Sequence, residues 1–233
     1  MQKPERMLRK AGLIGGMSWE TTAMYYRLLQ EQTQQTFGSG VSLPCLIDSL
    51  PFHEVTTYQH DGDWDAVGRM LADSAVRLEQ SGARFIGILS NTVHLRIRDV
   101  EQAVSIPVMS ITEAAAAAVS ASRILVLGTS FTVDHRLYDQ ALRDRGIEPI
   151  YLPAPLQQDL HKKIFSELTS GIVTADTEAL VERCARHGRD AGCTSMLLGC
   201  TELELAAKSD ILPFVSTVQA HVDRLFQEAV SGV

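Results

Sequence analysis

The sequence predicts an α/β protein built from two similar lobes, each a parallel sheet covered by helices. Short apolar runs alternate along the chain with helix-length amphipathic segments, which is the pattern of an α/β fold with parallel strands. The order of features also repeats, because Leu13–Ser18 and Leu125–Ser130 each open one half with a strand and a glycine turn. Roughly seventy residues later each half offers a second strand that ends in a small polar cluster, Ile86–Thr92 and Met196–Glu202.

Eight strands and six long helices follow from the apolar runs and from the cap and stop residues around them. The expected strands are Ala11–Ile14, Leu43–Asp48, Phe85–Leu89, Val108–Ser110, Ile124–Leu127, Pro149–Leu152, Ser195–Leu198 and Phe214–Val215. The expected helices are Trp19–Gln34, Asp65–Gln80, Glu113–Ala121, Asp134–Arg145, Ala175–Ala191 and Gln219–Ala229. We expect a first lobe of residues 1–112 plus 214–233 and a second lobe of residues 113–213.

The composition limits the possible partners. Of the 233 residues, 45% are hydrophobic and 21% are charged, which is ordinary for a soluble globular protein. The net charge of −7 and the lack of a basic stripe argue against nucleic acid or an anionic membrane as partner. The apolar stretch Ala11–Met17 is too short for a signal peptide core or a membrane span, so we expect a cytoplasmic protein with a small-molecule ligand.

The sequence offers no site for a metal or a cofactor. The four cysteines (Cys45, Cys184, Cys193 and Cys200) form no Cys-x-x-Cys pair, and no histidine pair has metal-ligand spacing. We therefore expect free thiols and no metal. Neither nucleotide-binding glycine motif occurs, and none of the five lysines stands at an expected strand end, where it could anchor pyridoxal phosphate. Cofactor-free chemistry is the consistent interpretation.

Cys200 stands where a catalytic thiol would be expected. It ends an apolar strand and precedes an expected helix over Thr201–Ala207, in which Thr201 and Glu204 have the spacing of a capping box. Amides at a helix N-terminus stabilise a thiolate, so we expect the thiol pKa to lie below about 8.5. The same amides suit a carboxylate ligand. A lone cysteine is more often a small buried hydrophobe, but this context favours a base beside a carboxylate site.

Ser90 holds the equivalent place in the first half. Ligands of open α/β sheets bind beyond the carboxyl ends of the strands, so two facing halves would bring Ser90 and Cys200 to opposite sides of one cleft. Asn91 and Thr92 could donate hydrogen bonds to a carboxylate, although a turn with local side-chain bonds explains the same residues. A serine hydroxyl is a poor base without a helper, and His94 is close enough in sequence to be one.

These motifs resemble the aspartate/glutamate racemase family of cofactor-independent amino-acid racemases. Gly12–Glu20 with Tyr25 and Tyr26 is similar to the family's opening, and Ser90–His94 to its first catalytic motif, which normally reads Cys-Asn-Thr-x-His. Leu198–Leu203 resembles the second catalytic motif. The remaining similarities are Pro51-Phe52, Gly128–Thr132, Ile164–Leu168 with Gly171, and Thr217 with His221. The resemblance covers nearly the whole chain.

The resemblance implies two α/β lobes related by a pseudo-twofold axis, an active site between them, and a homodimer. It also implies one thiol on each face of the substrate Cα, so that Cys200 is one acid/base and Ser90 occupies the place of the other. The residues that it implies in the substrate site are Met17, Ser18, Asn91, Thr92, Thr129, Thr132, Thr201 and Glu202.

Two positions depart from the family pattern, and they leave alternatives open. Ser90 replaces the first cysteine, and Ser216 stands where an aspartate is common. A racemase or epimerase of amino acids, with aspartate or glutamate favoured, is the first hypothesis. A lyase or isomerase with one cysteine, like the arylmalonate decarboxylases, is the second, and an inactive carboxylate-binding homologue is the third. An engineered Ser90 would imply an ordinary racemase as the parent protein.

Overall fold

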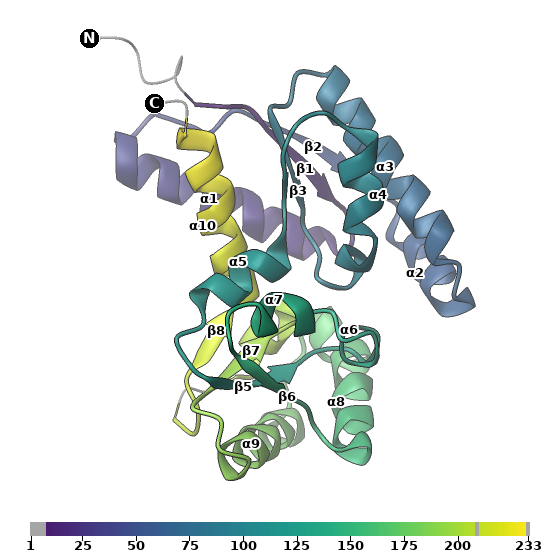
Figure 1. Ribbon diagram of the computed structural model, residues 1–233, viewed down its shortest axis with the longest axis vertical. Helices are drawn as coiled ribbons and strands as arrows, with labels where there is room; N and C mark the ends of the chain where they lie inside the picture. The colour runs from purple at the N-terminus through teal and green to yellow at the C-terminus, as the bar shows by residue number, and fades with distance from the viewer. Residues whose placement is uncertain (1–7, 208–209, 232–233) are drawn as a thin grey trace. The chain divides into compact units, whose positions relative to one another are not determined.

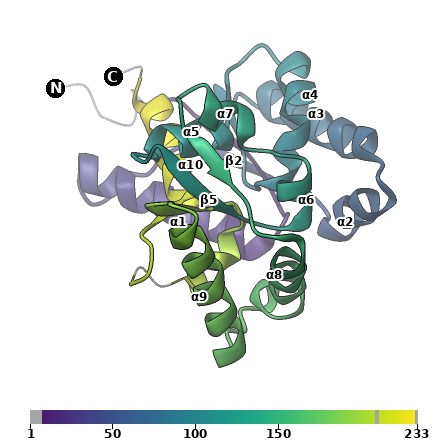
Figure 2. The same cartoon turned by 60° about the horizontal axis from the view of Figure 1, so that its bottom comes forward.

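The chain divides into two compact units in a computed structural model that describes residues 8–207 and 210–231. Unit 1 comprises the chain up to Ser110 together with the residues from His221 onward, and unit 2 comprises Ile111–Ala220. Within the described ranges each unit contains a four-stranded sheet, and every strand pair in both sheets is parallel (Figures 1 and 2).

The sheet of unit 1 has the order β2-β1-β3-β4. Its strands are β1 (Ala11–Gly15), β2 (Cys45–Ser49), β3 (Phe85–Ile88) and β4 (Val108–Met109). The two central strands, β1 and β3, are buried along their whole length, which explains their continuous apolar sequence. The chain therefore leaves β1 and β3 from neighbouring positions at the same end of the sheet.

Helices cover both faces of this sheet. The helical segments of unit 1 are α1 (Trp19–Phe37), α2 (Phe52–Asp61), α3 (Trp64–Gln80), the 3₁₀ helix η2 (Thr92–Arg96), α4 (Ile97–Ala103) and the part of α10 (Thr217–Val230) that begins at His221. Figure 1 shows α1 and α10 on one side of the strands and α3 and α4 on the other. The α3 and α4 side holds a core that includes Ile14, Leu71, Ile86 and Val100.

Unit 2 repeats the strand order of unit 1, as β6-β5-β7-β8. Its strands are β5 (Arg123–Leu127), β6 (Glu148–Ile150), β7 (Ser195–Leu198) and β8 (Phe214–Ser216). Its helical segments are α5 (Ile111–Ala118), α6 (Ser130–Asp134), α7 (Asp139–Arg143), α8 (Ala154–Ser166), η3 (Leu168–Ser170), α9 (Ala175–Asp190) and η4 (Thr201–Leu205). Figure 2 shows α8 and α9 together on one side of β5, and α5 and α7 on the other. No helix of the described residues is long and apolar enough to cross a membrane.

The strand predictions and the internal repeat are confirmed, because all eight expected strands are present and the two sheets share one order. The helix expected over Asp134–Arg145 is wrong. The chain instead forms α6 and α7, separated by Arg136, whose φ of 54° is left-handed and interrupts a helix. Helices α2, α4 and α8 were not expected. Two of them begin beside proline, with Pro51 before α2 and Pro155 in the first turn of α8.

The two compact units differ from the expected lobes at both boundaries. The first boundary lies between Ser110 and Ile111, two residues before the expected position. The second lies between Ala220 and His221, whereas the sequence placed it between residues 213 and 214. The reason is strand pairing: Phe214–Ser216 forms β8 and pairs with β7, so this segment belongs to the sheet of unit 2.

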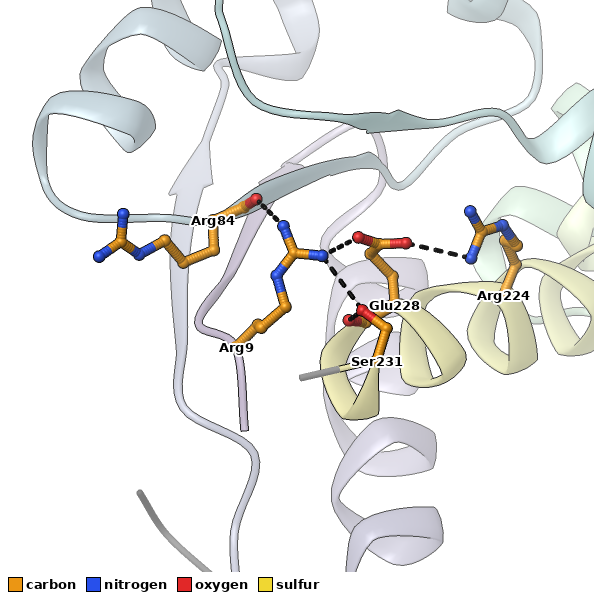
Figure 3. A network of polar contacts seen from close by, with 5 residues as sticks. All are labelled: Arg9, Arg84, Arg224, Glu228 and Ser231. Atoms are coloured by element: carbon orange, nitrogen blue, oxygen red, sulfur yellow. Dashed lines mark hydrogen bonds and ion pairs between the residues drawn. The ribbon is translucent and has the colours of Figure 1, made fainter. Parts of the chain in front are cut away.

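A polar network joins the segment before β1 to the last turns of α10 (Figure 3). The Arg9 guanidinium donates to Glu228, to the hydroxyl of Ser231 at 3.2 Å and to the carbonyl of Arg84 at 2.9 Å. Arg224 donates to the other carboxylate oxygen of Glu228 at 3.3 Å. The network holds residues that are far apart in sequence at one end of unit 1, and so fixes α10 against the sheet.

Two buried histidines lie in the interior of unit 1. His221 of α10 donates from Nε2 to the Met109 carbonyl at 2.9 Å, and its Nδ1 accepts from the Tyr25 hydroxyl at 3.1 Å. His94 donates from Nδ1 to the Ser90 carbonyl at 2.6 Å. The two imidazole rings meet edge to face, with centroids 5.8 Å apart. Burial lowers the pKa of His94 to about 4; burial and the neighbouring His94 lower the pKa of His221 to about 3.

The histidine pair predicts a loss of stability in mild acid. In the unfolded chain both imidazoles take up protons near pH 6.5, whereas the folded protein resists protonation down to about pH 4, so stability falls as the pH drops through this range. Between pH 7.5 and pH 5 the expected loss is on the order of 1–2 kcal/mol per histidine. Urea unfolding at the two pH values measures it.

Glutamine variants isolate this effect from other titrating groups. His94→Gln and His221→Gln should each be less stable than the native chain at pH 7.5 but lose less stability on acidification. His53→Gln is the control, because the side chain of His53 is 82% exposed. A pH dependence that is unchanged in both buried variants would contradict the assignment.

Candidate active site

The expected site residues of unit 1 begin at the turn that follows β1. Gly16 has a φ of 87°, and a Cβ there would stand 2.2 Å from the Leu50 carbonyl oxygen, so only glycine fits this turn. Its amide donates to the Thr22 hydroxyl at 2.9 Å. Ser18 caps α1 by accepting from the Thr21 amide at 3.3 Å, and Met17 is buried in the core. Both expected site residues therefore also have a structural role.

The turn after β3 carries the remaining expected residues of this half. Ser90 is partly exposed, Asn91 is buried, and Thr92 begins η2. The Ser90 hydroxyl has no hydrogen-bond partner within residues 8–207 and 210–231. His94 bonds the Ser90 carbonyl and not its hydroxyl, so the expectation of a helper base at His94 is not met. His94 instead orients the backbone of the Ser90 turn.

In unit 2 the backbone pairing of β5 with β7 continues one residue past the end of β7. The Gly199 amide donates to the Leu127 carbonyl at 2.7 Å, and a Cβ on Gly199 would stand 2.9 Å from that same oxygen. Glycine is therefore required immediately before Cys200. This contact places Cys200 beside the turn that follows β5.

That turn carries Thr129 and Thr132, both buried. The Thr129 hydroxyl caps α6 by accepting from the Thr132 amide at 3.3 Å, and the two hydroxyls lie 3.3 Å apart. Hydroxyls held in this way can donate to an anionic ligand. The structure thus brings Thr129, Thr132, Cys200, Thr201 and Glu202 to the carboxyl ends of two adjacent strands.

Cys200 contacts a carboxylate. Its thiol donates to Glu202 Oε2 over 3.0 Å, and the Thr201 hydroxyl donates to the same oxygen over 2.6 Å. Burial raises the pKa of the Cys200 thiol well above its ordinary value, and the adjacent charge of Glu202 raises it further. The backbone amides of Glu202 and Leu203 act in the opposite direction but do not prevail. The prediction of a lowered pKa was therefore wrong.

The local structure after Cys200 also differs from the expected α-helix. Thr201–Leu205 is a 3₁₀ helix, and Cys200 precedes it without a side-chain cap. The capping box is absent because the Thr201 hydroxyl bonds Glu202, while Glu204 accepts from the Ser216 hydroxyl. Glu202 was expected only as a substrate contact, and the structure gives it a direct bond to the thiol.

Two residues that support the turn after β5 in unit 2 were not singled out for this role by the sequence. Gln157 and His161 of α8 bond the turn between β5 and α6, with Gln157 donating to the Gly128 carbonyl at 2.9 Å and His161 accepting from the Ser130 amide at 3.1 Å. A polar residue at the buried position 157, beside apolar Leu160 and Ile164, was the available signal. Among the described residues, no three histidine, cysteine or acidic side chains are grouped so that they could hold a metal ion.

Comparisons with known proteins show the family and the fold of the chain. The sequence pattern of the Asp/Glu/hydantoin racemase family matches residues 14–225. The chain is 29% identical over 147 residues to the broad specificity amino-acid racemase RacX of Bacillus subtilis (strain 168), an alignment that covers 60% of this chain and 63% of that protein. The chain therefore spans less than two thirds of that relative's length.

Two solved structures share the fold over nearly their whole length. A candidate Asp/Glu racemase from Yersinia pestis superposes with a TM-score of 0.90 at 28% identity, covering 96% of this chain and 100% of that one. An aspartate racemase homologue from Pyrococcus horikoshii OT3 superposes with a TM-score of 0.82 at 29% identity, covering 95% and 99%. With its matched fold and a family match over residues 14–225, the chain belongs to the Asp/Glu/hydantoin racemase family.

Proposed function

We propose that the chain is a cofactor-independent amino-acid racemase or epimerase that removes and returns the proton at the substrate Cα. The observation that carries the proposal is the 3.0 Å contact between the Cys200 thiol and the Glu202 carboxylate. A thiol with a proton acceptor in contact is an acid/base pair that can work on a carbon acid. Family membership and the activity named for the Bacillus subtilis relative support the same reaction class.

The proposed substrates are amino acids, with aspartate or glutamate favoured. Their carboxylate would be held by hydroxyl and amide donors, and the residues proposed to line the site are Met17, Ser18, Asn91, Thr92, Thr129, Thr132, Thr201 and Glu202. None of the turns that carry these residues contains arginine or lysine. Arg96 and Arg123 are held by Asp99 and Glu148, respectively, so neither is an evident clamp for a second carboxylate. The proposal therefore includes amino acids beyond the acidic pair.

In the proposed mechanism, Cys200 gives its proton to Glu202 and the resulting thiolate takes the proton from Cα. The electron pair of the C–H bond moves into the substrate carboxylate, whose developing charge is stabilised by the threonine and asparagine donors. A proton then returns to carbon. The abstraction leaves Cys200 protonated, so the same thiol can return a proton to the face that it deprotonated. That proton comes from solvent once the thiol has exchanged it with the protonated Glu202 carboxyl or with water.

Ser90 would serve the opposite face of the substrate, following the family pattern. Its hydroxyl can donate a proton to a carbanion, but among the residues that the structure describes no base contacts it that could make it a proton acceptor. Since the two enantiomers have equal free energies in solution, racemisation must have equal kcat/KM in both directions. The asymmetry between Cys200 and Ser90 should therefore appear in proton exchange rather than in racemisation.

The first prediction from the proposed function concerns exchange of the α-proton in heavy water. It is measured for each enantiomer of aspartate and glutamate by NMR and chiral chromatography. One enantiomer should take up deuterium with its configuration retained, faster than either enantiomer is racemised, because Cys200 can return a deuteron to the face it deprotonated. Exchange that always accompanies racemisation would show two working faces. Saturable binding without exchange would favour an inactive binding protein, and loss of CO₂ from a malonate would favour the one-cysteine decarboxylase.

The second prediction is that Ser90→Cys raises racemisation by about 100-fold or more, the usual contribution of a positioned acid/base group. Exchange at the Cys200 face should change much less. Ser90→Ala is the matched variant, and it should keep exchange with retention while racemisation falls. Racemisation that does not increase in a folded Ser90→Cys protein would count against the proposed role of this position.

The third prediction separates proton transfer from structure at Glu202. Glu202→Gln removes the proton acceptor, so α-proton exchange should fall by about 100-fold. The same change removes the negative charge that raises the pKa of Cys200, so alkylation of Cys200 by iodoacetamide should become faster. Glu204→Gln, on the same 3₁₀ helix, should alter neither rate by more than a few-fold. If the rates of α-proton exchange and of Cys200 alkylation both fell or both rose in Glu202→Gln, the result would contradict the role assigned to Glu202.

We further propose a homodimer in the cytoplasm, with α1 and β2 at the interface. Trp19, Ala23 and Tyr26 form an exposed stripe on α1, and Ile47 is exposed on β2, an edge strand in the described sheet. The Gln30 side chain bonds both backbone groups of Leu43 and so ties α1 to the segment that enters β2. Free thiols fit a reducing compartment, which cell fractionation would test.

The fourth prediction follows from this surface. Tyr26→Lys and Ile47→Lys place a charge in the proposed apolar interface, so each should shift the mass measured by light scattering from dimer toward monomer. Ile172→Lys is the control, because Ile172 is similarly exposed but lies in unit 2. A native chain that is monomeric at micromolar concentration would refute the dimer.

A further inference from the structure

One side chain beside the proposed substrate turn of unit 2 has a hydrogen-bonding atom that the structure leaves unused. Gln157 donates from Nε2 to the Gly128 carbonyl at 2.9 Å. A carbonyl oxygen only accepts, so this contact fixes which end of the amide is nitrogen. The other end, Oε1, is buried and accepts no hydrogen bond in the part of the chain that the structure describes.

This arrangement is unusual for a purely structural residue. The Gln157 side chain is 5% exposed and lies on the same face of α8 as the fully buried Leu160 and Ile164. An apolar side chain would fill this position without leaving an acceptor unsatisfied. Native proteins rarely bury an acceptor without a partner, and the exceptions tend to mark a functional requirement or a bound water.

The surroundings of Gln157 indicate what that requirement is. The turn that Gln157 holds carries Thr129 and Thr132, which are the proposed carboxylate donors, and α8 contacts it again through the bond between Ser130 and His161. An amino acid presents a carboxylate, which needs donors, and an ammonium group, which needs acceptors. The hydroxyls of Thr129 and Thr132 match the carboxylate, and Oε1 of Gln157, which lies on α8 and bonds the turn before them, matches the ammonium group.

We propose that Gln157 receives the ammonium group of the substrate at Oε1, directly or through one buried water. This assignment rests on the proposed racemase function and adds to it a basis for selecting amino acids over the corresponding deaminated acids. Because Oε1 is covered in the free protein, neighbouring side chains must move aside or a small water must bridge the gap when the ligand binds.

The test compares aspartate with succinate, which has the same two carboxylates and lacks only the ammonium group. Isothermal titration of the full chain should show aspartate binding at least about tenfold more tightly, the usual effect of a hydrogen bond to a charged group. Gln157→Met fills the space without an acceptor and should abolish the preference. Gln157→Lys keeps a donor for the Gly128 carbonyl but adds a positive charge, and should favour succinate.

Gln158→Met is the matched control, since Gln158 is exposed on the same helix and should keep the native preference. Circular dichroism and thermal melting establish that each variant is folded. If the Gln157 variants do not fold, a crystal structure of the native chain with aspartate decides instead. The ammonium nitrogen should lie within hydrogen-bond distance of Oε1 or share one water with it, and a nitrogen bound elsewhere would overturn the proposal.

The outcomes separate this proposal from the proposed function. A native chain that prefers aspartate over succinate, loses the preference in Gln157→Met and yet exchanges no α-proton would support the ammonium site and refute the racemase. A chain that racemises aspartate while Gln157→Met retains the full preference for aspartate would support the racemase and refute the ammonium site. Equal affinity of the native chain for both ligands, or no binding of aspartate, would overturn the ammonium site.

Discussion

The close approach of the ends of β5 and β7 is the constraint on which the chemistry of unit 2 depends. The bond between the Gly199 amide and the Leu127 carbonyl leaves no room for a side chain at position 199, and it places Cys200 beside the turn that carries Thr129. Parallel strands deliver their ends to one edge of the sheet, and glycine at position 199 lets the backbone pairing of β5 and β7 continue to that edge. Thiol, carboxylate and hydroxyls are thereby gathered from segments about seventy residues apart in the sequence.

The two units share a strand order, but the groups around Cys200 in unit 2 differ from those around Ser90 in unit 1. In unit 2 a carboxylate contacts the thiol of Cys200, so this half is equipped for proton transfer. In unit 1 the neighbouring polar groups are neutral buried histidines, and His94 bonds the backbone of Ser90 and not its hydroxyl. That half is equipped to hold a turn in position. The internal repeat is therefore a repeat of architecture, and the chemistry of the two halves is not equivalent.

Much of the fold could be predicted because buried parallel strands leave a plain signal, a short apolar run that ends in glycine or small polar residues. The pairing of β8 with β7 leaves no such signal in the sequence. Residues 214–220 were therefore expected in the first lobe, whereas they lie in unit 2. Helices α2 and α8 have proline at the N-cap and no side-chain cap, so they lack the serine, threonine, aspartate or asparagine cap that marked the expected helices. At the site, Cys200 was expected from its place after an apolar strand and Glu202 from the family resemblance, and the thiol pKa was predicted in the wrong direction. The amides that lower a pKa can be inferred from position, whereas the burial that raises it depends on the whole core.

A protonated resting thiol has a consequence for any reaction at Cα. Deprotonation of an amino acid at carbon is uphill, and a thiolate generated by proton transfer to Glu202 is a stronger base than one stabilised by amides alone, because its conjugate acid has the higher pKa. The cost is that only a small fraction of the enzyme holds the thiolate at neutral pH. Contact with Glu202 offsets that cost by providing the acceptor within 3.0 Å, so the proton need not first reach solvent. Burial of Cys200 and the placement of Glu202 are thus two parts of one arrangement, and neither would support proton abstraction without the other.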